Sequence, residues 1–266
     1  MMKRLKYYLK LLLLFIRFSL MAQMEYRLNF VSSLLVEIGY LLVKLSYVAV
    51  IYSTGVTIGG MTPDQIVIFI GSYILMTGLY MFFIPSFYAI SGNVREGRLD
   101  MLIVKPLSLQ FIMTLQRFDF GMPIPNVTGG LILICMCWSR AGLTVSFTHI
   151  AGFILFTLTG VFLTYCMFLI PKLLSFWFVS TSGISQMTDA LWDFNNMPMN
   201  LYSNWIQKLG TFIIPIFVIT NFPGLCAMDR LTPGYAAWGL AVPFLAFALQ
   251  RAVFKRAVRH YTSASS

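Results

Sequence analysis

The sequence is poor in charged residues. Only 11% of its 266 residues are Asp, Glu, Lys or Arg, whereas 58% are hydrophobic and 16% are aromatic. An ordinary globular domain carries about a quarter charged residues, and a soluble fold of this length needs a far more polar exterior. The mean hydropathy of +0.79 points the same way. The composition therefore excludes a soluble domain and predicts a polytopic membrane protein.

Residues that bind metals or carry out catalysis are also scarce. The chain has two histidines and four cysteines, Cys135, Cys137, Cys166 and Cys226, which lie in or beside apolar segments. Metal sites need convergent ligands at set spacing, so we expect buried free thiols, no metal and no cofactor. The dipeptide Gly-Lys of the phosphate-binding loop G-x-x-x-x-G-K-[ST] does not occur. The chain is predicted not to be an enzyme, and any ATP hydrolysis must belong to another polypeptide.

Long apolar segments, in contrast, are abundant. A helix that crosses a bilayer needs about 20 mostly apolar residues. Such segments occur at 29–53, 64–90, 121–138, 147–170 and 235–249, with one more between 173 and 228. The predicted fold is an all-α integral membrane protein with six transmembrane helices, in which residues 1–266 form a single transmembrane domain.

The fifth span can be drawn in two ways. Residues 211–228 can form it, which leaves 173–205 as a long cytoplasmic loop. Alternatively, 173–192 forms the span and 198–228 folds back at the outer face as a re-entrant hairpin. Three prolines in that last stretch interrupt helical hydrogen bonding, and irregular backbone at membrane depth is tolerated where protein covers it. Periodicity leaves both drawings open.

Basic residues gather on one side of the predicted spans. Six precede the first span, four separate the second from the third, and four follow the last. Cytoplasmic loops of membrane proteins carry such an excess of Lys and Arg, so both termini are predicted to be cytoplasmic. Residues 1–27, which combine basic side chains with Leu and Phe, are expected to form an amphipathic helix at the membrane surface.

One segment between the second and third spans, SGNVREGRLDMLIVKPLSLQ at 91–110, is densely charged. Leu99, Leu102 and Ile103 recur at helical spacing with charges opposite, which predicts a short amphipathic helix. Pro106 ends it, because the residue before a proline disfavours helical geometry. The helix either floats among the lipid headgroups or binds a soluble partner through apolar side chains, with its charges setting the register.

The stretch EGRLDMLIVKPLSLQF resembles the cytoplasmic segment of the ABC-2 type permeases, in which a glycine, an acidic residue, a leucine and a Lys/Arg-Pro recur at similar spacing. YRLNF, LLSFWFVSTSG and PMNLY followed by IIPIFVITNFPG resemble a group of six-span bacterial members. The resemblance implies the permease subunit of an ATP-driven exporter of a hydrophobic or amphipathic substrate, in the bacterial cytoplasmic (inner) membrane. It also favours the drawing in which 198–228 is a re-entrant hairpin before the last span.

The same resemblance implies a docking site and partners. Segment 92–106 would be the coupling helix, which sits in a cleft of a cytoplasmic ABC ATPase that binds ATP and Mg. The residues expected to couple are Arg95, Glu96, Arg98, Leu99, Asp100, Leu102, Ile103 and Lys105. The other expected partners are membrane lipid and a second permease subunit, identical or related; nucleic acid is not expected.

Two ionisable residues lie inside the first span. Glu37 and Lys44 are seven residues apart, which places them on one helix face. Ionisable groups in a bilayer are costly and face protein or water. They are expected to line a substrate path or a subunit interface, or else to form a structural ion pair with other spans. The polar cluster of Asp189, Asp193, Asn195 and Asn196 is expected at a hydrated outer end of the fifth span.

A secondary transporter driven by an ion gradient is the alternative function. Such proteins use intramembrane carboxylates and are commonly built from inverted repeats. Glu37 is the one candidate carboxylate, and the sequence shows no internal repeat. The exporter subunit is therefore the preferred hypothesis.

Overall fold

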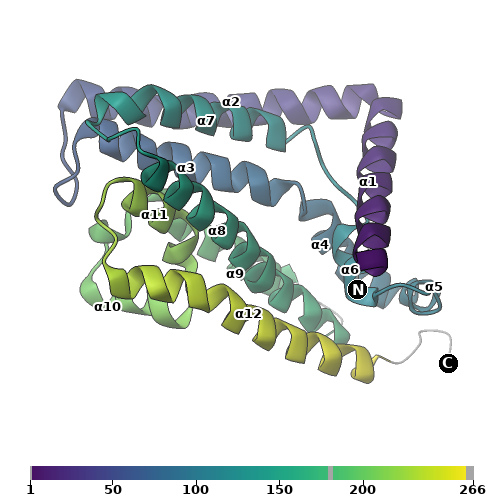
Figure 1. Ribbon diagram of the computed structural model, residues 1–266. Helices are drawn as coiled ribbons and strands as arrows, with labels where there is room; N and C mark the ends of the chain where they lie inside the picture. Colours follow the sequence, from purple (N-terminus) through teal and green to yellow (C-terminus); the bar gives the residue numbers. More distant parts are fainter. Residues whose placement is uncertain (1, 179–181, 262–266) are drawn as a thin grey trace.

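The computed structural model describes residues 2–178 and 182–261, and the regular elements in those ranges are helices. Five long helices run back and forth between two ends of a bundle (Figure 1): α2 (Arg27–Thr54), α3 (Pro63–Met81), α7 (Pro123–Arg140), α8 (Phe147–Leu173) and α12 (Pro233–His260). The connections between them carry the shorter elements. The connections lie at two opposite ends of the bundle, which are called the basic end and the far end below.

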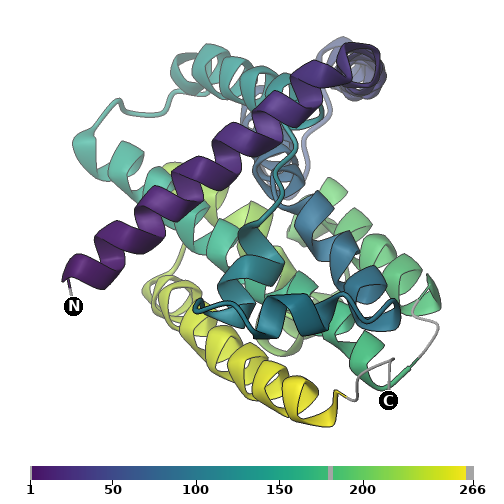
Figure 2. The ribbon, with the colours of Figure 1, turned by 90° about the vertical axis from the view of Figure 1, so that its right-hand side faces the viewer.

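The basic end is the end of the bundle that holds the start of α1 and the end of α12 (Figure 1). It carries α1 (Met2–Glu25), α4 (Ile84–Arg95), α5 (Leu99–Ile103), α6 (Leu109–Leu115) and the turn η1 (Leu174–Phe176). Helix α1 lies across the spans, nearly at right angles to α2, and crosses the bundle end diagonally in Figure 2. This is the orientation that a helix lying in the membrane surface requires.

The far end is the opposite one, where α2 is joined to α3 and α7 to α8 (Figure 1). Helix α2 stops at Gly55, whose φ of 62° is a left-handed conformation that glycine adopts at little cost. Helix α3 then starts with a capping box, in which Thr62 and Gln65 satisfy each other's backbone N–H groups, followed by Pro63 in the first turn. Arg230 fastens this connection by donating to the carbonyl oxygen of Gly60 at 2.6 Å.

Four helices of the described chain are long and apolar enough to cross a membrane. They are α2, α3, α8 extended to Phe176, and α12. A fifth candidate is the pair Asn204–Ile213 and Ile216–Ala227, which is bent by 101°. Helix α7, with 18 residues, falls outside this set but packs along α2 and α3. The chain is thus a multi-pass membrane protein.

Neither drawing of the fifth span is realised as one straight helix. Residues 173–192 hold the end of α8, the turn η1 and then the 12-residue α9 (Ser182–Asp193). Residues 211–228 are broken at Pro215, where Ile214 leaves helical geometry with ψ of 82°. A proline disfavours the helical conformation in the residue before it and lacks the N–H that would continue the ladder. The single helix expected over 173–192 is therefore wrong.

The bent pair lies at the far end (Figure 1), which is where the hairpin of the second drawing was expected. It consists of α10 (Asn204–Lys208), the π-helical turn η4 (Leu209–Ile213) and α11 (Ile216–Ala227). The turns η2 (Phe194–Asn196) and η3 (Met199–Leu201) lead into it, and the Met199 N–H bonds to the side chain of Asn221 at 2.8 Å. Thr220 donates to Asn195 at 2.9 Å. These two bonds fix η2 and η3 to α11 and give part of the irregular backbone a protein partner, while Leu201, Trp205 and Ile213 remain exposed.

Helix α3 is the most buried of the four candidate spans, because 72% of its most apolar 18-residue stretch lies inside the protein. It contacts α7 backbone to backbone through glycines. A Cβ added at Gly130 would lie 2.6 Å from the amide nitrogen of Leu75, and one at Gly71 would lie 2.9 Å from Ile134. Small residues that let helices approach closely are the usual means of packing in lipid, where the hydrophobic effect between helices is absent.

We expect Gly130→Ala to destabilise the bundle. The new methyl group would meet backbone atoms of α3, which cannot rotate away, and overpacking of this kind costs about 1–3 kcal/mol. Gly39→Ala is the matched control, because it adds the same methyl group within α2 where nothing lies within 4 Å. Thermal unfolding in detergent should show a lower midpoint for the first variant only; equal midpoints would contradict the close packing.

Candidate functional site

The charged segment is not one amphipathic helix but two helical pieces joined by a turn. Helix α4 runs on to Arg95, and α5 begins at Leu99. Between them Gly97 has a φ of 69°, a conformation in which a side chain is strained. The turn lets α5 leave the direction of α4 and lie at the basic end of the bundle, where Figure 1 places it.

The charges of this segment are mostly exposed. Arg98 forms an ion pair with Glu96, and both side chains are about half exposed, at 54% and 46%. An exposed pair contributes little to stability, at most about 1 kcal/mol. Arg95 and Lys105 are exposed as well, so the outer surface of the segment is positive overall.

The structure corrects which apolar side chains can reach a partner. Leu99 is fully buried and Leu102 is 9% exposed, and both belong to the core cluster that includes Phe254 and Ala257 of α12. The side chains that point outward are Met101, Ile103 and Val104, which are 72%, 46% and 82% exposed. Leu99 and Leu102 therefore attach α5 to its own bundle. Only the opposite side of α5, which carries Met101 and Ile103, is open to a partner.

Asp100 lies beside the end of α12. Asp100 is half-buried. The burial of Tyr261 and the nearby Asp100 carboxylate both raise the pKa of the Tyr261 hydroxyl. Asp100 thus places α5 beside the residue that ends α12.

A buried polar network continues inward from α5. Gln110 of α6 donates to Gln250 of α12 and to Tyr165 of α8, each at 2.9 Å. Arg251 donates to the side-chain oxygen of Gln110, and Thr114 lies 3.2 Å from the Tyr165 hydroxyl. Gln110 and Gln250 are almost fully buried. These bonds join α6 to α8 and α12 at the basic end, although the Gln250 Nε2 is buried without a hydrogen-bond partner among the described residues.

Glu37 and Lys44 share one partner. The Asn126 amide of α7 donates to Glu37 at 2.8 Å, and Lys44 donates to the Asn126 oxygen at 3.3 Å. Asn126 is fully buried, and Glu37 is 6% exposed. The Lys44 ammonium also lies 5.2 Å from the ring centroid of Tyr73 in α3. The expected single helix face is correct, and the contacts are with two neighbouring helices of the same chain.

The acidic residues of α9 are not gathered at the far end. Asp189 accepts a hydrogen bond from Tyr88 of α4 at 3.1 Å, and the ammonium of the buried Lys172 lies 3.9 Å above the Tyr88 ring. Asn195, in contrast, is buried against α11, while Asp193 and Asn196 are exposed. The expected hydrated cluster is therefore divided between different environments.

Several of these residues were not predicted as site residues. Asn126, Gln110 and Gln250 provide the bridging amides of the two networks, and Lys172 provides a buried charge. Their signal in the sequence is a polar residue in or next to an apolar segment, which in a bilayer implies a partner. The identity of that partner depends on which helices are neighbours.

The comparisons with known proteins agree with this architecture. A family model described as ABC-2 family transporter protein matches residues 38–265, and the chain belongs to this family of permeases. The family is that of membrane subunits which act with an ABC ATPase. Comparisons with curated proteins and with solved structures gave no significant match.

We expect Asn126→Leu to destabilise the chain, because it leaves the buried Glu37 carboxylate without its donor. A buried polar group that loses its partner costs about 1–3 kcal/mol, and more when the group is charged. Thr128→Val is the control, since its hydroxyl bonds only to the backbone of its own helix on the exposed side of α7. Thermal unfolding in detergent measures both, and equal midpoints would show that the network is dispensable.

Proposed function

We propose that the chain is the permease half of an ATP-driven exporter and that a separate cytoplasmic ABC ATPase docks on α5. The supporting observation is the outer face of α5, on which Met101, Ile103 and Val104 are exposed among positive charges. Exposed apolar side chains at a bundle end, away from the lipid-covered sides, indicate a protein contact. The rim of Arg95, Arg98 and Lys105 supplies the electrostatic register.

The route from the ATPase to the transport path follows from the contacts of α5. Helix α5 packs on α6, Leu99 and Leu102 belong to the buried core, and the Gln110 network joins α6 to α8 and α12. We propose that a displacement of α5 is passed through α6 and this network to two spans. We propose that this coupling opens a cavity between two permease subunits alternately to the two sides of the membrane. The exported substrate is proposed to be hydrophobic or amphipathic.

The free side of α2 supports a second permease subunit. Only 11% of the most apolar 18-residue stretch of this helix is buried, so one long apolar face is open to lipid or to another subunit. Glu37 does not lie on that face, since it is buried against Asn126. We therefore propose that Glu37 and Lys44 stabilise the contact of α2 with α7 within one subunit rather than bind substrate or a second copy.

A secondary transporter is the weaker hypothesis. Its candidate ion-binding carboxylate, Glu37, is already hydrogen-bonded to an amide and shares that amide with Lys44. A protein of that class needs a carboxylate that exchanges ions with water. The family assignment also favours the ATP-driven machine.

Six crossings with both termini in the cytoplasm are proposed on the path of the chain. Helix α8 ends at the basic end and α12 begins at the far end (Figure 1), so the chain between them crosses once more. We propose that α9, η2 and η3 form this fifth, broken crossing, followed by the re-entrant hairpin. The excess of Lys and Arg at the basic end supports a cytoplasmic position for that end, and the proposed membrane is a bacterial inner membrane.

Labelling of single cysteines tests the proposed sidedness. A thiol at Ser108→Cys, near α5, should react only with reagent on the cytoplasmic side, and one at Asn200→Cys, at the far end, only with reagent outside. Both variants should be made in a chain whose four native cysteines have been replaced, because Cys135 is exposed and would react as well. Labelling of both positions from the same side would reject the topology.

Replacement of the outer face of α5 tests the docking. Met101→Ser together with Val104→Ser should weaken the capture of the ABC ATPase that co-purifies with the wild-type chain by about tenfold or more, since interface anchors are typically worth over 1 kcal/mol each. The fold should be unaffected, because both side chains are exposed. Quantitative pull-down and substrate-stimulated ATP hydrolysis in nanodiscs are the measurements.

Two further variants make this result specific. Val145→Ser is the matched control, an equally exposed valine at the far end, and it should capture the ATPase normally. Leu102→Ala should lower the unfolding temperature instead, because it removes a core side chain. Wild-type capture by the Met101 and Val104 double variant, or the absence of a co-purifying ATPase, would overturn the proposal.

A further inference from the structure

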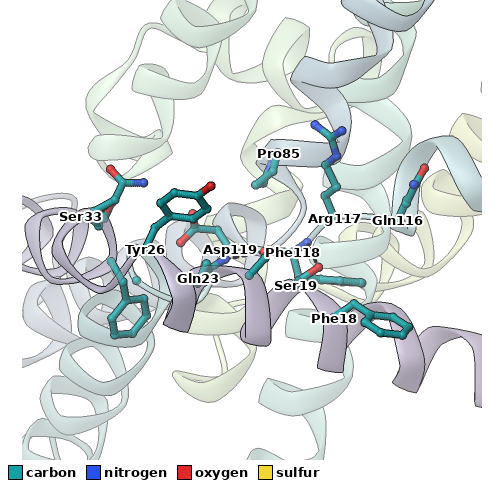
Figure 3. Close-up of a pocket in the computed structure, with 14 residues that line it drawn as sticks. Phe18, Ser19, Gln23, Tyr26, Ser33, Pro85, Gln116, Arg117, Phe118 and Asp119 are labelled. Atoms are coloured by element: carbon teal, nitrogen blue, oxygen red, sulfur yellow. Dashed lines mark hydrogen bonds between the residues drawn. The ribbon is translucent and has the colours of Figure 1, made fainter. Parts of the chain in front are cut away.

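A cavity of about 440 Å³ lies at the elbow where α1 meets α2 (Figure 3). One wall is formed by the two helices, and the other by the connection 116–121 between α6 and α7, with Pro85 of α4 beside it. Because α1 lies across the bundle end and α2 enters the bundle, the elbow sits at the depth where headgroups meet acyl chains.

The wall of the cavity is held in place by side chains of α1. The Phe118 N–H donates to the Ser19 hydroxyl at 3.1 Å. Gln23 donates to the Phe118 carbonyl at 2.7 Å and accepts the Phe120 N–H at 3.1 Å. Ser86 of α4 bonds to both the N–H and the carbonyl of Arg117 at 2.8 Å. The connection 116–121 is therefore a built wall, pinned from two sides.

Two opposite charges occupy this wall. Arg117 is exposed and Asp119 is half-buried, and within the described ranges neither forms an ion pair with any residue or with the other. One Asp119 oxygen accepts the Met122 N–H at 3.0 Å, which leaves the second oxygen open to a ligand. Figure 3 shows Arg117 and Gln116 extending from the same side of the connection.

The remaining lining is apolar or uncharged. Phe18, Phe30 and Phe118 contribute aromatic rings, of which Phe18 is 60% exposed on α1. Tyr26 lies at the elbow with a hydroxyl group. A ligand for this cavity must therefore carry a negative group for the guanidinium, a positive group for the carboxylate and an apolar part for the rings.

We propose that the cavity binds the headgroup of a zwitterionic phospholipid, with its phosphate on Arg117 and its ammonium group at Asp119. The acyl chains then run along the aromatic side of α1 and α2 into the bilayer. The guanidinium fork matches phosphate oxygens. A purely anionic headgroup fits less well, because Asp119 repels it. A soluble phosphate ester would leave the apolar wall without a partner.

Native mass spectrometry of the delipidated protein in detergent tests the site. Phosphatidylethanolamine should bind more tightly than phosphatidylglycerol of the same acyl chains, and soluble glycerophosphoethanolamine should bind at least about tenfold more weakly, since it lacks the chains. Arg117→Gln should weaken phosphatidylethanolamine binding about tenfold, the loss of one charge-assisted contact. Asp119→Asn keeps an oxygen for the Met122 N–H and should remove the preference for phosphatidylethanolamine.

Arg27→Gln is the matched control. It removes the same charge from the start of α2 outside the cavity lining and should bind phosphatidylethanolamine as the wild type does. If Arg117→Gln is not recovered folded, the Asp119→Asn comparison decides alone. Equal affinity of the wild type for the two lipids, unchanged binding by the variants, or tight binding of the soluble headgroup would each overturn the proposal. None of these outcomes depends on an ATPase, so the site is tested separately from the exporter function.

Discussion

The absence of water from the bilayer core is the constraint on which the structure depends. Each polar group at that depth needs a partner within the protein. Asn126 supplies one for Glu37 and Lys44, and Gln110 supplies one for Gln250 and Tyr165. The same requirement places the backbone of η3 against α11, where the Met199 N–H bonds to Asn221. The polar residues thus decide which helices stay together, while the apolar residues fill the space between them.

The two networks divide the bundle into functional parts. The Asn126 network fixes α2 to α7 within the spans, and α7 is in turn in glycine contact with α3. The Gln110 network fixes α6 to α8 and α12 at the basic end, directly behind the proposed docking helix. In the proposed mechanism, force applied at α5 would pass to α6 and, through this network, to α8 and α12. The unit of α2, α3 and α7 is available as the part against which they move.

Sequence periodicity predicts much of this fold but few of its contacts. The apolar lengths, the basic end and the helix α1 follow from composition, because each depends on a single segment in lipid or water. The orientation of α5 does not, since this five-residue helix has apolar side chains on two sides, and only the bundle decides that Leu99 and Leu102 point inward while Met101 stays exposed. Likewise, Glu37 and Asn126 are 89 residues apart, and no local pattern specifies their bond.

The attachment of α1 has a dynamic consequence. Ser19 and Gln23 tie this helix to the connection that follows α6, so α1 cannot stay behind when α6 is displaced. A helix that lies in the headgroup layer must then sweep sideways through it, against the viscosity of the lipid. The fluidity of the membrane surface would thereby act as a brake on each stroke, and the turnover rate would fall as the bilayer stiffens on cooling.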